Sequence, residues 1–157
     1  VFAAAGAGRI VVSEITKVRA EAAARSGAHV VLDPREPGFV QRALDETGGG
    51  ADVVVDAVGT QLPTALDLVR RGGKVLLFGM NQQAAPAVRQ NTITRYEISV
   101  LGTYIAKYTF APAIRVLESG AVNADALITH RVNIANIHEG LDAMRSGEAV
   151  KVIVTPD

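Results

Sequence analysis

Short β-branched runs alternate with helix-forming segments along most of this sequence, and that alternation restricts the fold more than any other feature. The runs are apolar at nearly every position, as expected for strands buried on both faces of a parallel sheet. Parallel neighbours need a crossover connection, which helical segments between the runs supply. The expected strands are Arg9–Ser13, His29–Leu32, Asp52–Asp56, Lys74–Phe78 and Glu97–Gly102.

Helical segments separate these strands, and glycines follow most of them. Gly72-Gly73 is expected to end the third helix, and Asn136 is expected to cap the last one. The predicted fold is α/β, a doubly wound parallel (Rossmann) sheet. The expected helices are Thr16–Ser26, Phe39–Leu44, Leu62–Val69, Phe110–Leu117 and Ile137–Ser146, and two further extended segments are Leu127–Val132 and Val150–Val154.

Composition excludes several classes of function. Lys plus Arg number 16 and Asp plus Glu number 16, without a block of like charge, so we expect neither nucleic acid nor an anionic membrane surface as a partner. The chain has no cysteine, which excludes disulfides, thiolate zinc sites and cysteine nucleophiles. Apolar stretches are too short to span a bilayer and no signal peptide is evident, so a soluble cytoplasmic protein is expected.

No catalytic or metal-binding group is evident from the sequence. The three histidines, His29, His130 and His138, belong to three different elements and lack the spacing of metal ligands. No Ser-His-Asp order and no nucleophile elbow can be assembled either. The sequence therefore shows no catalytic constellation.

An acidic residue stands where a dinucleotide-binding unit needs one. In such units the second strand ends in Asp or Glu, which accepts hydrogen bonds from the adenosine ribose, about 20 residues after a glycine-rich turn. Glu14 has this position, and a glycine-rich turn about 20 residues before it would lie ahead of Val1. We therefore expect the first strand and its glycine turn to be missing, and the chain to be a fragment of a longer protein. Alternatively, Glu14 is a solvated acid ahead of a helix, and Arg19 points into water.

Two other strands run into small residues at their carboxyl ends. Val53–Gly59 and Val75–Met80 both end in glycine-containing turns. Ligands in open α/β sheets bind outside the carboxyl ends of the strands, where glycine lets the backbone come close. These ends are candidates for the nicotinamide side of a dinucleotide site, although the glycines could equally serve only the turns.

Several segments, in register over nearly the whole chain, closely resemble the zinc-type medium-chain dehydrogenases, which include the sorbitol and threonine dehydrogenases. Each motif is weak alone, but together they are specific to that superfamily. The matching segments are Arg9–Glu14 with Arg19, Ser26–Pro34, Ala51–Gly59, Gly72–Gly79, Leu127–Arg131 and Glu148–Val154.

The resemblance implies a cofactor, NAD, and a set of residues that contact it. It implies that Glu14 binds the adenosine ribose and that Arg19 lies near the adenine, and an acid there disfavours the 2′-phosphate of NADP. At Ile105 the sorbitol dehydrogenases that resemble this chain carry arginine, which argues against sorbitol as the substrate. The full predicted cofactor-binding set is Glu14, Arg19, Val58, Gly59, Phe78, Gly79, Met80, Thr103, Tyr104 and Ile105.

The resemblance also implies a small alcohol or polyol substrate, oxidised with NAD and zinc. In the family a cysteine, a histidine and an acidic residue of the preceding half hold the catalytic zinc, and none of those positions exists here. Residues 1–126 are then the truncated dinucleotide-binding domain and residues 127–157 a segment that returns toward the catalytic half. Two alternatives stay open: a zinc-free quinone-type reductase of the same superfamily, and a non-catalytic nucleotide-binding or assembly module.

The missing first strand is expected to leave two buried edges unpaired, beside the strands that end at Glu14 and Asp56, because it lies between them in the order 3-2-1-4-5-6. We therefore expect the isolated chain to be marginally stable, or its strands to rearrange around the gap. Members of the family commonly form dimers through the last strand of the sheet. Glu97–Gly102 is the corresponding edge here, so we expect a homo-oligomer.

Overall fold

The computed structural model describes residues 1–105 and 108–156 and divides into two compact units. The first unit combines residues 1–35 with the residues from Tyr108 onward, and the second spans residues 36–107. This division follows contacts within the structure. The sequence-based boundary between residues 126 and 127 concerns the relation to a catalytic half, and it stays a prediction.

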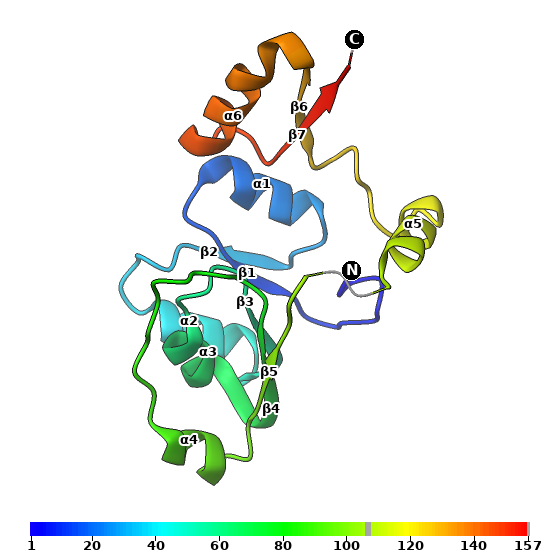
Figure 1. Cartoon of the computed structure of the whole chain (residues 1–157). Helices are drawn as coiled ribbons and strands as arrows, with labels where there is room; N and C mark the ends of the chain where they lie inside the picture. The colour runs from blue at the N-terminus through cyan, green and yellow to red at the C-terminus, as the bar shows by residue number, and fades with distance from the viewer. Residues whose placement is uncertain (106–107, 157) are drawn as a thin grey trace. The chain divides into compact units, whose positions relative to one another are not determined.

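The first unit contains two small parallel sheets (Figure 1). Strand β1 (Val11–Ser13) pairs with β2 (Val30–Leu32), and α1 (Lys17–Arg25), which packs on both, buries Ala22. In the second sheet β6 (Ile128–Asn133) pairs with β7 (Lys151–Thr155). The 3-10 turn η1 (Ile134–Asn136) and helix α6 (Ile137–Ser146) connect β6 to β7, and α6 packs against both strands.

The second unit is a three-stranded parallel sheet in the order β3-β4-β5. Helix α3 packs on β3 and β4, and α2 packs on α3 (Figure 1). The core of this unit lies between the sheet and α3, where Val75 is completely buried. Its elements are α2 (Phe39–Glu46), β3 (Ala51–Asp56), α3 (Leu62–Leu68), β4 (Val69–Leu77), α4 (Gln90–Arg95) and β5 (Ser99–Gly102).

The predicted α/β class is confirmed, because every strand pairing is parallel and a helix connects the strands of each pair. Within the sheets, the orders β2-β1 and β3-β4-β5 reproduce the partial orders 3-2 and 4-5-6 of a dinucleotide-binding sheet without its first strand. Among the described strands, β1 and β3 each pair on one side only. The expected unpaired edges are therefore present.

The predicted boundary between the third helix and the fourth strand was wrong. Gly72-Gly73 does not end α3; the helix stops at Leu68, and β4 already begins at Val69 opposite Ala51. The register between β3 and β4 then shifts, so that Val53 pairs with Lys74. The two glycines therefore belong to an irregular stretch of β4, so the glycines that the sequence analysis took for a helix stop lie within a strand.

Two more details differ from the prediction. The strand expected from Glu97 begins at Ser99, because Glu97 has a φ of 55° and ends the turn that follows α4, a helix the sequence did not predict. Asn136 occupies the N-cap position of α6, but its side chain makes no capping hydrogen bond. Asn133 instead accepts a hydrogen bond from the Asn136 N–H, at 3.0 Å, and so caps η1.

Candidate functional site

Glu14 follows the first strand of the first unit and organises the start of α1. Its Oε1 accepts hydrogen bonds from the Ile15 N–H at 2.9 Å, the Thr16 N–H at 2.8 Å and the Thr16 hydroxyl at 3.0 Å. No described residue donates a hydrogen bond to Oε2. The half-buried side chain is therefore held by one oxygen, and the other can accept hydrogen bonds from a ligand.

An arginine from the loop after β2 reaches the same segment. The Arg35 guanidinium donates to the Ile15 carbonyl at 3.1 Å and forms an ion pair with Asp33, with its Nη2 2.6 Å from a carboxylate oxygen. Hydrogen bonds from Arg35 lower the pKa of Asp33 from 3.8 to about 2. The loops that follow β1 and β2 are thereby joined. Arg19, on α1, is half-buried and forms no ion pair with the described residues.

In the second unit, Asp56 at the end of β3 is the organising residue. It is 4% exposed, and its carboxylate accepts hydrogen bonds from three backbone N–H groups. The Val58 and Gly59 N–H groups donate to Oδ1 at 2.9 and 2.7 Å, and the Gln61 N–H donates to Oδ2 at 2.8 Å. The Asp56 carbonyl also accepts from the Phe78 and Gly79 N–H groups, at 2.9 and 2.7 Å. Asp56 thus fixes the loops after both β3 and β4.

Two glycines allow these loops to touch through their backbones. A Cβ built on Gly79 would lie 2.4 Å from the backbone nitrogens of Val58 and Gly59. A Cβ on Gly59, which has a φ of 90°, would lie 2.7 Å from the Asn81 nitrogen. Both positions therefore require glycine. The sequence left open whether these glycines serve a ligand or a turn, and the structure shows that they let two turns pack together.

The third loop, after β5, is attached to the same edge of the sheet. The Thr103 N–H and hydroxyl both donate to the Leu77 carbonyl, at 3.1 and 3.0 Å. Tyr104 and Ile105 follow and are exposed, with Ile105 at a φ of 49°. Residues 106 and 107, which continue this loop, lie outside the described part of the chain.

The carboxyl ends of β3, β4 and β5 carry an exposed apolar strip. Parallel strands present their carboxyl ends at one edge of a sheet, so the side chains after these three strands share that edge. Large apolar groups are unusual there unless something covers them. The exposed fractions are 62% for Val58, 64% for Phe78, 62% for Met80, 74% for Tyr104 and 75% for Ile105.

The ten predicted cofactor-binding residues thus fall into two groups. Glu14 and Arg19 belong to the first unit, and the other eight lie on the three carboxyl-end loops of the second. The sequence interpretation did not include Asp56 or the Asp33–Arg35 pair in the site. A strand-end aspartate before a Gly-containing turn does signal a residue that accepts backbone N–H groups, but no spacing rule connects Arg35 with Ile15.

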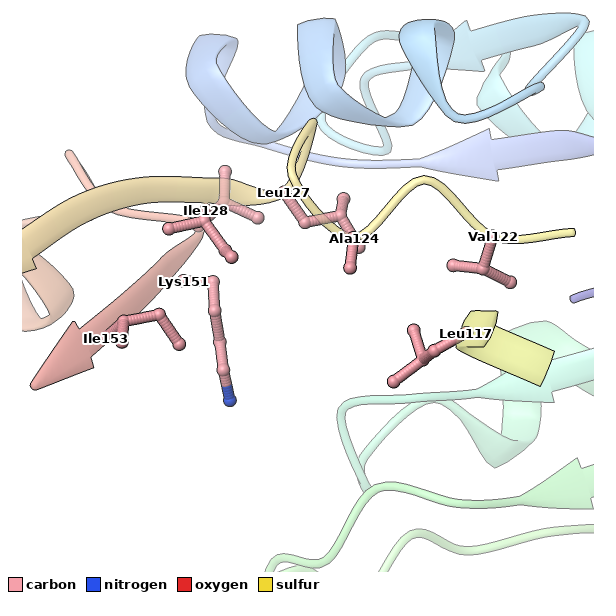
Figure 2. Close-up of a pocket in the computed structure, with 8 residues that line it drawn as sticks. Leu117, Val122, Ala124, Leu127, Ile128, Lys151 and Ile153 are labelled. Carbon is pink, nitrogen blue, oxygen red and sulfur yellow. The ribbon is translucent and has the colours of Figure 1, made fainter. Parts of the chain in front are cut away.

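A separate apolar groove lies in the first unit and contains none of the predicted cofactor-binding residues. It has a volume of about 400 Å³, and Figure 2 shows its side chains, contributed by α5 (Phe110–Glu118), the loop that follows, β6 and β7. Lys151 is the single charged residue among those that line it. The groove thus lacks a group of polar side chains that could hold a polar ligand.

The described residues contain no cluster of three or more histidine, cysteine, aspartate or glutamate side chains that could hold a metal ion. Within the same residues, no helix combines the length and the apolar character that crossing a bilayer demands.

Comparisons with known proteins match this architecture to one family. The family model described as zinc-binding dehydrogenase matches residues 1–119. D-arabinitol dehydrogenase 1 from Uromyces fabae is 31% identical over 97% of this chain and 46% of its own length. The sorbitol dehydrogenase from Bombyx mori is 30% identical over 96% of this chain and 45% of its own length.

Among solved structures, 2R,3R-butanediol dehydrogenase from Bacillus subtilis superposes with a TM-score of 0.86 at 26% identity, over 99% of this chain and 46% of that one. The chain therefore spans less than half the length of the relatives it matches. The resemblance inferred from the sequence motifs is confirmed. With its parallel sheets, its glycine-linked strand ends and a family match that covers most of its residues, the chain belongs to the zinc-binding dehydrogenase family.

Proposed function

We propose that this chain is the NAD-binding portion of a zinc-dependent dehydrogenase that oxidises a small secondary alcohol or polyol. The observation that carries the proposal is the exposed apolar strip at the carboxyl ends of β3, β4 and β5, in a chain of this family. A strip in that position offers a weakly polar surface at the edge where open α/β sheets bind their ligands.

The adenosine end of the cofactor is assigned to the first unit. Oε2 of Glu14 is oriented by the bonds to Oε1 and would accept hydrogen bonds from the ribose hydroxyls. A carboxylate at this point repels a 2′-phosphate, which favours NAD over NADP. Arg19 is assigned to the adenine, where a guanidinium can stack on the aromatic ring.

The nicotinamide end is assigned to the second unit. When bound, NAD supplies the hydride acceptor of the reaction. Phe78, Met80 and Tyr104 would cover the ring and keep water from it, while Gly59 and Gly79 keep the backbone loops in place. Asp56 stabilises this arrangement, because it accepts hydrogen bonds from the loops that follow β3 and β4.

Zinc does not fit the residues that the structure describes. They contain no metal-ligand cluster and the sequence contains no cysteine, so the metal of the parent enzyme would be held elsewhere. We also propose that residues 127–157 form the segment that returns toward the catalytic half.

We further propose that a second copy of the chain pairs along β5. This strand is hydrogen-bonded to β4 on one side, and Leu101 is 46% exposed. An exposed edge of a sheet is a template for another strand, and two-fold pairing along it is closed. Light scattering should give the mass of a dimer, and Leu101→Lys should reduce it to that of a monomer.

Titration calorimetry with NAD⁺ and NADP⁺ tests the cofactor assignment. NAD⁺ should bind more tightly than NADP⁺, Glu14→Ala should weaken NAD⁺ binding about tenfold or more, and Phe78→Ala should weaken it less. Val154→Ala, at an exposed apolar position of β7, is the matched control and should change nothing. If Glu14→Ala bound NAD⁺ as tightly as the unaltered chain does, the assignment of Glu14 to the adenosine ribose would be contradicted. Oxidation of a panel of alcohols and polyols by the complete gene product tests the reaction itself.

A further inference from the structure

Arg35 and Asp33 form a charged pair beside the segment that Glu14 holds. The Arg35 Nε lies 2.9 Å from Asp33 Oδ1 and 3.1 Å from Oδ2, and Nη2 lies 2.6 Å from Oδ2. Nη2 also donates to the Ile15 carbonyl. The edge of the guanidinium formed by Nε and Nη2 therefore faces the carboxylate, and Nη2 also binds the backbone carbonyl of Ile15.

The same residue, Ile15, connects this pair to the proposed ribose carboxylate. Its N–H donates to Glu14 and its carbonyl accepts from Arg35, so a single residue separates the guanidinium from the Glu14 side chain. Arg35 is 66% exposed and can meet a ligand that enters from solvent. Its charge, however, is balanced by Asp33 through two donor nitrogens.

This arrangement determines the charge that a ribose 2′-substituent would meet. A guanidinium beside the ribose is the usual means of accommodating a 2′-phosphate, and a carboxylate is the usual means of excluding one. With the pair intact, Glu14 is the carboxylate that a ribose substituent meets, and Arg35 is neutralised by Asp33. If the Asp33 charge is removed, Arg35 becomes an uncompensated cation next to Glu14.

We propose that Asp33 is a specificity-determining residue that keeps 2′-phosphorylated dinucleotides out of the site by neutralising and orienting Arg35. The inference rests on the proposed function, because it assumes that adenosine binds beside Glu14. It goes beyond that function in assigning the discrimination to a pair from the loop after β2, in addition to the acid that follows β1.

The experiment compares two nucleotides that contain only the adenosine end. Adenosine 5′-monophosphate and adenosine 2′,5′-bisphosphate are titrated into the full chain, and the dissociation constants are read from NMR shifts. The unaltered chain should favour the monophosphate about tenfold. Asp33→Asn, which keeps the shape but not the charge, should move this ratio toward the bisphosphate about fivefold or more.

Two further variants separate the pair from a general charge effect. Asp33→Asn combined with Arg35→Gln should return the ratio to that of the unaltered chain, because the gain requires the released guanidinium. Asp52→Asn is the matched control: Asp52 forms a similar exposed ion pair with Arg70, at 2.6 Å, in the other unit. It should leave the ratio unchanged.

The outcomes distinguish the inference from the function on which it rests. If the monophosphate binds and Glu14→Gln weakens it, but Asp33→Asn leaves the ratio unaltered, the inference is overturned and the adenosine site stands. The inference is equally overturned if the gain of Asp33→Asn survives the loss of Arg35. If neither nucleotide binds, or if Glu14→Gln has no effect on binding, the proposed function is overturned together with the inference.

Discussion

Glu14 and Asp56 occupy equivalent places, each at the carboxyl end of a parallel strand, yet the structure uses them differently. Asp56 is 4% exposed and both of its carboxylate oxygens accept backbone N–H groups. Glu14 is half-buried, and a single oxygen accepts all of its hydrogen bonds. The comparison teaches that an acid at a strand end is a ligand-binding candidate only when part of its hydrogen-bonding capacity is left over. By that criterion Asp56 supports the loops, and Glu14 is the candidate for binding a ligand.

The largest effect is expected at the glycine contact that Asp56 supports. Gly79→Ala places a Cβ 2.4 Å from the backbone of Val58 and Gly59, and neither backbone can move without breaking bonds to Asp56. We expect a loss of about 3 kcal/mol in the free energy of unfolding. Urea unfolding followed by circular dichroism measures it. Gly102→Ala, with no atom within 4 Å of the added Cβ, is the control. A similar midpoint for both variants would contradict the contact.

Substitutions of the two acids should affect different properties: that of Asp56 the stability of the fold, and that of Glu14 the binding of a nucleotide. Asp56→Ala leaves three partly buried N–H groups without their acceptor and should cost about 2 kcal/mol. Glu14→Ala removes bonds at a partly solvated turn and should cost about 1 kcal/mol or less. Urea midpoints give the first comparison and adenosine monophosphate titration the second, in which Glu14→Ala should lose binding. If Glu14→Ala lowered the stability as much as Asp56→Ala, the claim that only Asp56 has a structural role would be contradicted.

The sequence predicted the helices and strands better than it predicted the contacts between loops. The alternation of β-branched runs and helices was enough to identify the strands and their parallel class, because burial on both faces produces a local apolar signal. It could not place the end of α3, where a tertiary pairing of Val69 with Ala51 overrides a glycine helix stop. Asp33–Arg35 was equally beyond prediction, because its link to Ile15 spans two loops. Local pattern thus specifies elements, and contacts between loops specify the site.

The loop after β5 is also held by hydrogen bonds to a strand end, but by fewer of them than Asp56 accepts. Thr103→Val deletes a hydroxyl that donates to the Leu77 carbonyl, but the Thr103 N–H still donates to the same oxygen. Since no buried acceptor is left unpaired, the expected loss of unfolding free energy is only about 0.5 kcal/mol. Thr103→Ser, which keeps the hydroxyl, is the control. A loss as large as that of Asp56→Ala would mean that this hydroxyl, rather than the backbone, holds the loop.

The smallest effect concerns pH and the pair beside Glu14. Arg35 lowers the pKa of Asp33 from 3.8 to about 2, so the folded state binds this proton less readily than the unfolded chain does. The contribution of the pair to stability is therefore fully present above pH 3.8 and is lost as the pH falls through about 2. An NMR titration of the Asp33 carboxyl carbon should show a midpoint near 2, and Arg35→Gln should raise it toward 3.8. Arg70→Gln, which removes the guanidinium of a separate exposed ion pair, is the matched control and should leave the Asp33 midpoint near 2. If Arg35→Gln also left the Asp33 midpoint unchanged, the guanidinium would not be bound to this carboxylate in solution, and only Glu14 would be left to exclude a 2′-phosphate.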